Sequence, residues 1–251
     1  MIKPEVVAPD EEVDLIGHVF EAPLVSKGWT WLPLTQLFTW AIMVREAGRK
    51  HPEWDWPTRL EVGGYTMGAI LGSEWCHNLA HAAVSKWLGK PVDCIRVTWG
   101  MPLLVYFDTE DPDVTPRQHI IRSLGGPAIN AIFLGIAILL KPVTHPNSKA
   151  REFIDTLIGM NIFLTSGGML PIPYIDGGTA LKWTLVEKGH TSQEADETLK
   201  KVNAVTAVGL GVSAAAAFKK KQRFLGGIFA MFAATSLLIA TNLLNENDSR
   251  R

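Results

Sequence analysis

Cysteine is scarce in this sequence, and neither sign of charge dominates it. The 251 residues include two cysteines, Cys76 and Cys94, which form no C-x-x-C pair, so a disulfide framework or a thiolate zinc site is not expected. The formal net charge is -1, whereas proteins that bind nucleic acid carry a basic face or stripe. We therefore expect no nucleic-acid partner.

The sequence also lacks a linker rich in Gly, Ser or Pro, and it lacks the pattern of a signal peptide. Residues 1–20 are acidic and contain no apolar core, which argues against a secretory signal. We predict an extramembrane N-terminal extension over residues 1–28. A single membrane domain is expected over residues 29–251.

Charge is absent from two apolar stretches. Residues 132–140 contain no polar side chain, and residues 224–244 contain no charged one. About 20 mainly apolar residues are needed for a helix to cross a bilayer, so the second stretch is long enough alone. The sequence predicts an integral, multi-pass membrane protein with the lipid bilayer as a partner. The alternative is a soluble helical protein, which would have to bury several wholly apolar helices.

Apolar periodicity and Pro/Gly breaks predict an all-α, polytopic helical bundle with one small β-hairpin. The hairpin is expected at residues 91–107 around Trp99-Gly100, and residues 182–201 are expected to be polar and solvent-facing. A first segment, residues 29–44, either spans the membrane or lies at its interface. The later helices are predicted at residues 62–88, 119–140, 153–170, 202–218 and 224–244, the last two forming a closing hairpin over 202–244.

Two histidines stand four residues apart in the predicted helix 62–88, in the run HNLAH at residues 77–81. Residues at this spacing lie on one face of a helix, so the imidazoles of His77 and His81 can reach one ion. They form the ligand half of the HExxH zinc motif. Because polar groups in an apolar membrane helix are costly unless they bind something, a metal site is favoured over a structural pair.

A third ligand is expected from Asp176. It follows the run Pro171-Ile172-Pro173, where prolines interrupt a helix, and it precedes Gly177-Gly178, which lets another element approach closely. An Asp-Gly-Gly triplet alone is usually just a turn. The combination with the histidine pair favours a metal ligand.

Three motifs together resemble the site-2 proteases, a family of intramembrane zinc metalloproteases. The resemblance covers about residues 62–183, and the motifs occur in the family's order. They are HNLAH at residues 77–81, SLGGPAIN at 123–130 and LPIPYIDGG at 170–178. The resemblance implies a site-2-protease-like core with one Zn²⁺ held by His77, His81 and Asp176, and water at the fourth position.

The sequence departs from the family pattern at two positions. Asn78 stands where the family has its general-base glutamate, and a side-chain amide cannot accept a proton near neutral pH. Gly168 stands where the family often has an asparagine that is thought to help hold substrate. The resemblance therefore implies metal binding without the usual catalytic group.

Glu74 is the one nearby candidate for a substitute base. It lies three residues before His77 on the same helix, and could act as a base from one turn away or as an extra metal ligand. The competing interpretation is that Glu74 hydrogen-bonds within the bundle or orients an imidazole, which is favoured because proton transfer tolerates little displacement.

Three functions stay open on these residues. The first is a homologue with impaired or lost peptidase activity, a pseudoprotease that binds zinc and a transmembrane client. The second is an active intramembrane metalloprotease that uses Glu74 as its base. The third is a structural membrane protein without metal.

Overall fold

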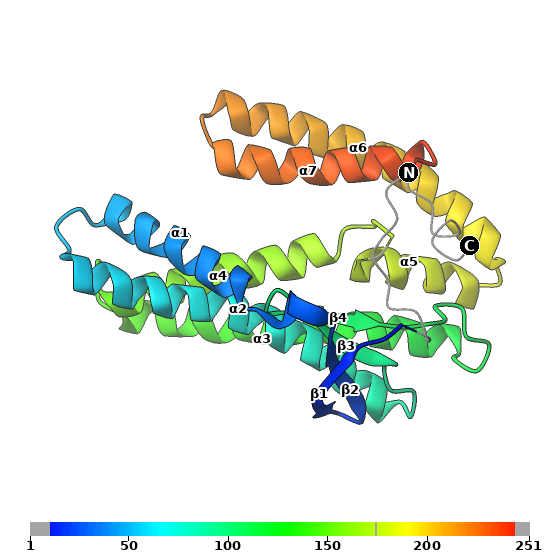
Figure 1. The fold of residues 1–251 in the computed structure, drawn as a ribbon. Coiled ribbons are helices and arrows are strands. Elements are labelled where there is room, and N and C mark those ends of the chain that lie inside the picture. Colours follow the sequence, from blue (N-terminus) through cyan, green and yellow to red (C-terminus); the bar gives the residue numbers. More distant parts are fainter. Residues whose placement is uncertain (1–10, 174, 244–251) are drawn as a thin grey trace. The chain divides into compact units, whose positions relative to one another are not determined.

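The computed structural model describes residues 11–173 and 175–243 (Figure 1). The first ten residues of the predicted N-terminal extension, Tyr174 of the third motif and Leu244 at the predicted end of the closing hairpin lie outside this part. The described elements, in chain order, are β1 (Asp14–Val19), β2 (Ala22–Ser26), η1 (Gly28–Trp31), α1 (Leu34–Lys50), α2 (Trp56–Trp87), β3 (Cys94–Thr98), β4 (Met101–Val105), α3 (Pro116–Leu140), η2 (Lys141–Val143), α4 (Lys149–Gly168), α5 (Asp176–Glu187), α6 (Ser192–Lys219) and α7 (Arg223–Ala240).

The predicted helical bundle with a small β element is confirmed. The hairpin at Trp99-Gly100 is present as β3 and β4, but it belongs to a four-stranded sheet that also includes β1 and β2. Helix α2 begins at Trp56, six residues before the predicted start, because Asp55 accepts a hydrogen bond from the backbone N–H of Thr58 and Pro57 occupies the first turn. From this N-cap, α2 continues for 32 residues.

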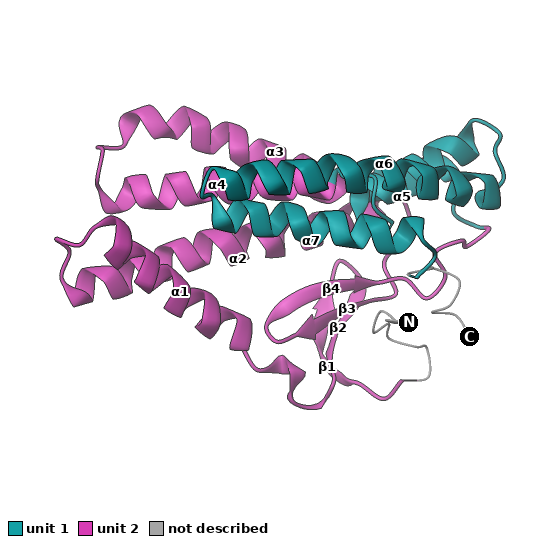
Figure 2. Cartoon of the chain, turned by 90° about the horizontal axis from the view of Figure 1, so that it is seen from above, with its two compact units in different colours: residues 1–6, 113–123, 169–251 teal, residues 7–112, 124–168 magenta. Residues whose placement is uncertain are grey.

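The described elements divide into two compact units (Figure 2). One unit contains the sheet, α1, α2, α4 and the part of α3 from Leu124 onward. The other contains the start of α3 up to Ser123, together with α5, α6 and α7.

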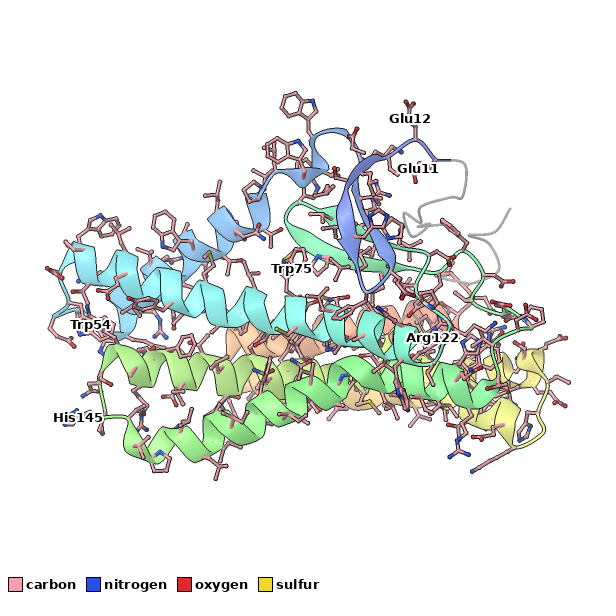
Figure 3. All side chains as sticks on the ribbon, turned by 90° about the horizontal axis from the view of Figure 1, so that it is seen from below. Glu11, Glu12, Trp54, Trp75, Arg122 and His145 are labelled. Atoms are coloured by element: carbon pink, nitrogen blue, oxygen red, sulfur yellow. The ribbon has the colours of Figure 1, made fainter. Side chains whose placement is uncertain are left out.

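The sheet has the order β1-β2-β3-β4, with antiparallel outer pairs and a parallel central pair. Two-residue turns close both hairpins with positive φ, at Phe20-Glu21 and at Trp99-Gly100, which is the backbone shape that matches strand twist. The Gly100 carbonyl accepts hydrogen bonds from Gln36 of α1 and Trp75 of α2. Trp75 lies on the side of α2 that faces the sheet (Figure 3).

One face of α2 packs on the sheet through apolar side chains. Ala82 is fully buried in a cluster with Ile95 and Val92, and Leu79 packs against the same cluster. Trp75, Leu79 and Ala82 are spaced so that they share one helix face. The sheet therefore fixes which way the remaining faces of α2 point.

The other end of α2 is joined to α1 and α4. Gly63 lets α1 approach closely, since a Cβ there would lie 3.1 Å from Cα of Val44. In the connection between α1 and α2, the imidazole of His51 lies between the carboxylates of Glu53 and Glu152, and Lys50 pairs with Glu152 at 2.8 Å. Because Glu152 belongs to the first turn of α4, these contacts tie the α1–α2 connection to α4.

In the second unit, α6 and α7 form an antiparallel hairpin, drawn in yellow-orange and red in Figure 1. Helix α6 starts ten residues before the predicted boundary, because Thr191 and Glu194 form a reciprocal capping box. The expectation that residues 182–201 face solvent is wrong at several positions. The buried ones are Lys182, Trp183, Ala195 and Leu199.

Three helical segments in the described part are long and apolar enough to cross a membrane: Pro116–Val143, Ser192–Lys219 and Arg223–Ala240. Large apolar side chains on α6 stay uncovered, including Val205 at 75% exposure, Val208 and Val212. Uncovered apolar surface on such helices is what a bilayer would contact.

Candidate metal centre

The face of α2 opposite the sheet is polar. Ser73, His77 and His81 recur every four residues and so lie in one row along the helix. Ser73 and His81 are buried, at 2% and 6% exposure, and His77 is half-buried. The helix thus carries a buried polar row on one side and an apolar contact with the sheet on another.

The two imidazoles meet through their Nε2 atoms, which lie 3.2 Å apart. The rings are roughly perpendicular, with centroids separated by 4.8 Å. Two nitrogen ligands about 2.0–2.1 Å from a tetrahedral zinc are about 3.3 Å apart. The pair therefore has the separation that a shared zinc ion requires, and imidazole nitrogen is a preferred zinc ligand.

Helix α3 approaches this pair through two glycines. A Cβ at Gly125 would lie 3.1 Å from the Ala80 carbonyl oxygen, and one at Gly126 would lie 2.6 Å from Nε2 of His77. The backbone N–H of Gly126 donates to Nδ1 of His81 at 3.3 Å. The Gly-Gly-Pro segment thus brings the α3 backbone against both imidazoles, which no residue with a side chain could do.

His77 also has a hydrogen-bond partner that the sequence reasoning did not assign to the site. Its Nδ1 lies 2.5 Å from Oδ1 of Asn130, a fully buried residue of α3. Asn130 in turn donates to Asn161 of α4 at 2.7 Å. The available signal was an asparagine in each of two apolar helices, since polar side chains in such helices are rarely without a role.

Asp176 is the first residue of α5, in the other unit. It is half-buried, and the first turn of a helix favours a negative side chain. Gly177 and Gly178 are buried, and a Cβ at Gly178 would lie 2.7 Å from the Pro173 nitrogen. The two glycines therefore let α5 start tightly against the proline segment.

The proline segment has its own anchor in α6. The fully buried side chain of Asn203 donates to the Pro171 carbonyl at 2.7 Å. Pro171 lies outside the helices, so its carbonyl has no intrahelical N–H donor, and the Asn203 amide supplies one. The chain before Asp176 is thereby held in a fixed path within its unit.

Asn78 and Glu74 contact each other on α2. The side-chain amide of Asn78 donates to the Glu74 backbone carbonyl at 3.0 Å and to its carboxylate Oε1 at 3.3 Å. Both residues are half-buried. Asn78 therefore uses its amide N–H groups on Glu74, one turn back along the helix.

No protein-family model matches the chain, and no curated protein sequence matches it either. A solved structure does: the Site-2 Protease from Methanocaldococcus jannaschii, with a TM-score of 0.54 over 90% of this chain and 95% of that chain. The chain has a site-2-protease-like fold. Sequence identity over the match is 12%, so the likeness establishes the architecture of this membrane protein, and its chemistry must be argued from its own residues.

Proposed function

We propose that this chain is a site-2-protease-like membrane protein that binds one Zn²⁺ through His77, His81 and Asp176 and has lost ordinary peptidase activity. The observation that carries the proposal is the histidine pair, whose Nε2 atoms lie 3.2 Å apart on a buried helix face. The fold likeness and the carboxylate of Asp176 support the third ligand. Zinc held there would act as a Lewis acid toward a carbonyl oxygen.

The loss of ordinary activity follows from Asn78. An amide nitrogen donates hydrogen bonds and an amide oxygen has no usable basicity near neutral pH, so Asn78 cannot take a proton from water and pass it to a leaving amine. Its N–H groups are directed to Glu74. The proposed role is therefore to bind a transmembrane client without cutting it.

The same contact supports a second candidate function. Asn78 holds the Glu74 carboxylate one turn from the position where the family has its base. In this alternative, Glu74 is the base of an active intramembrane metalloprotease. A third candidate, a structural membrane protein without metal, is favoured by the fact that the two imidazoles can hydrogen-bond to each other.

Zinc content separates the metal-binding candidates from the structural one. Purified wild-type protein should carry about one zinc per chain, and the double variant His77→Ala/His81→Ala should carry none. Thr66→Val, a buried change on the same helix away from the histidines, should keep the zinc. Equal zinc in wild type and the double variant would rule out the proposed site.

Cleavage of a membrane-peptide substrate separates the two enzymatic candidates. If only the base is missing, Asn78→Glu should raise activity by about 10²–10⁴-fold, the usual contribution of general-base catalysis, and Asn78→Gln should not. If wild type already cleaves and Glu74→Gln abolishes cleavage, Glu74 is the base. In that case Glu61→Gln, an exposed change on the same helix, should leave the rate unchanged.

We further propose a multi-pass arrangement, with an extramembrane extension over residues 1–28 and a membrane domain over residues 29–251. If α6 crosses the bilayer, its flanking turns lie on opposite sides. Gly189→Cys and Lys220→Cys, each made in a Cys76→Ser/Cys94→Ser background, should then react with an impermeant thiol reagent from opposite sides. Reaction of both from the same side would contradict the crossing.

A further inference from the structure

Four polar side chains from three helices form a hydrogen-bonded chain that ends on His77. Asn161 of α4 donates to Oγ of Ser73 at 3.0 Å and to the Leu157 carbonyl at 2.8 Å. Asn130 of α3 donates to Oδ1 of Asn161 at 2.7 Å, and Oδ1 of Asn130 lies 2.5 Å from Nδ1 of His77. All of these residues belong to the same compact unit.

The chain is deeply buried. Asn130 and Asn161 are both 0% exposed, and Ser73 is 2% exposed. A buried amide without hydrogen bonds costs about 1–3 kcal/mol by mutational measure, so two apolar residues would be the simpler way to fill this space. The two amides avoid this cost only because each forms hydrogen bonds within the chain. Their presence therefore calls for a role beyond packing.

Two backbone carbonyls fix the direction of the hydrogen bonds in the chain: Leu157 accepts from Asn161 at 2.8 Å, and Ser73 accepts from Asn130 at 3.4 Å. The Leu157 carbonyl can only accept, so the atom of Asn161 that faces it must be the amide nitrogen. The oxygen of Asn161 then faces Asn130, which must present its own nitrogen there. The oxygen of Asn130 is left facing His77, and two acceptors cannot bond to each other. Nδ1 of His77 must carry the hydrogen.

We infer that Asn130 and Asn161 are positioning residues that hold His77 in its Nδ1–H tautomer. That tautomer leaves the lone pair of Nε2 pointing toward His81, so His77 is in the form that binds a metal ion through Nε2. Without metal, this lone pair accepts the hydrogen on Nε2 of His81, whose Nδ1 accepts from the Gly126 N–H. Metal binding by His81 through Nε2 would require its hydrogen to move to Nδ1. Asn130 acts directly on the imidazole, and Asn161 acts by keeping the amide of Asn130 from turning over. The consequence for zinc rests on the proposed function, whereas the tautomer itself does not.

The tautomer is measurable without any metal. Selective ¹⁵N-histidine labelling distinguishes a protonated from an unprotonated ring nitrogen, and the signals of His77 are assigned by their absence in His77→Gln. At pH 8, metal-free wild type should show Nδ1 of His77 protonated and Nε2 unprotonated. The opposite pattern, or an even mixture of the two tautomers, would overturn the inference.

Three variants test the relay. Asn130→Leu and Asn161→Leu should each shift His77 toward a tautomer mixture. Asn130→Asp should preserve the Nδ1–H form, because an ionised carboxylate presents only acceptors, and a neutral carboxyl group donates its O–H to Oδ1 of Asn161 and turns its carbonyl oxygen to His77. Thr66→Val, a buried change on the same helix outside the chain, should leave the spectrum unchanged. An unchanged tautomer in Asn161→Leu would overturn the relay, and loss of the Nδ1–H form in Asn130→Asp would do the same.

Zinc affinity, measured by competition with a chromophoric chelator, tests the consequence. Asn130→Leu should bind zinc about 10–100-fold more weakly than wild type, the usual effect of removing a partner of a histidine ligand, with Asn130→Asp close to wild type. If wild type binds no zinc but shows the predicted tautomers, the proposed zinc site fails and the positioning role stands. If wild type binds zinc and Asn130→Leu binds it equally well, the positioning role fails alone.

Discussion

Two faces of helix α2 are stabilised in different ways. The face toward the sheet is apolar, with Ala82 and Leu79 packed against Ile95. The face toward α3 and α4 carries the polar row Ser73, His77 and His81. The first gains stability from burial alone, whereas the second must satisfy each polar group individually. The comparison indicates that burial against the sheet supports one face of α2, whereas the other face depends on specific hydrogen-bond partners from α3 and α4.

The largest expected effect comes from the apolar face. Ile95→Ala removes a side chain that is 0% exposed and should lower the free energy of unfolding by about 2–5 kcal/mol. Leu103→Ala on the same sheet, where the side chain is 46% exposed, should cost much less. Thermal unfolding in detergent measures both. Zinc content of folded Ile95→Ala should equal that of wild type, and loss of zinc would mean that the two faces are not separable.

On the polar face, Gly126→Ala should remove bound zinc while costing less stability than Ile95→Ala. The added methyl group would lie 2.6 Å from Nε2 of His77, so an imidazole or the α3 backbone must move, at a cost of about 1–3 kcal/mol. We expect loss of bound zinc, measured by metal analysis. Gly135→Ala is the matched control, because nothing lies within 4 Å of its added Cβ on the same helix. Retention of zinc in Gly126→Ala would contradict close packing of α3 on the histidines.

A third prediction concerns the contacts of Glu152 of α4 with Lys50 and His51 in the connection between α1 and α2. These contacts are called the clamp here. Burial raises the pKa of Glu152, but hydrogen bonds from Lys50 and His51 outweigh it and hold the pKa below its ordinary value of 4.5. A lowered carboxyl pKa stabilises the folded state fully above about 4.5, and the contribution is lost as pH falls through the folded-state pKa. Glu152→Gln should therefore lower the melting temperature at pH 6 and flatten its fall below pH 4.5.

Melting temperatures between pH 3 and pH 7 measure this effect. Glu12→Gln, a change at an exposed carboxylate, is the control and should retain the wild-type profile. A Glu152→Gln profile parallel to wild type across the whole range would show that the clamp does not contribute to acid sensitivity.

The smallest expected effect is that of Trp75→Phe at the junction of α2 and the sheet. The change removes one of two donors to the Gly100 carbonyl, and Gln36 still donates to it at 2.6 Å. A lost hydrogen bond of this kind costs about 0.5–1.5 kcal/mol, or a few degrees in melting temperature at this chain length. Trp87→Phe, at 76% exposure, should change it less. Equal shifts in the two variants would mean that the bond at Gly100 contributes nothing.

Local patterns in the sequence predicted what is local in the structure. The four-residue spacing of His77 and His81 suffices to place both imidazoles on one face, because a helix has 3.6 residues per turn. The turn at Trp99-Gly100 was likewise predicted from its residues. Helix starts were placed too late where a cap decides them, as at Asp55 and Thr191.

Other features depend on packing between distant segments and escaped prediction. Asn130 and Asn161 lie on different helices, and nothing in the local sequence of either indicates their contact. The hairpin of β1 and β2 was missed because its turn residues, Phe20 and Glu21, have positive φ, a backbone region that neither residue type favours. The pairing of Asp176 with the histidines rests on motif resemblance and stays a prediction.

The parallel pairing of β2 with β3 bears on the order in which the protein can fold. Leu24 pairs with Ile95, and the whole of α1 and α2 lies between them in the chain. A parallel pair closes only after its intervening segment has emerged and folded back, so its kinetics are governed by loop closure rather than by strand propensity. During synthesis, the edge of β2 that pairs with β3 therefore has no hydrogen-bonding partner until α2, the helix that bears the histidines, has been made.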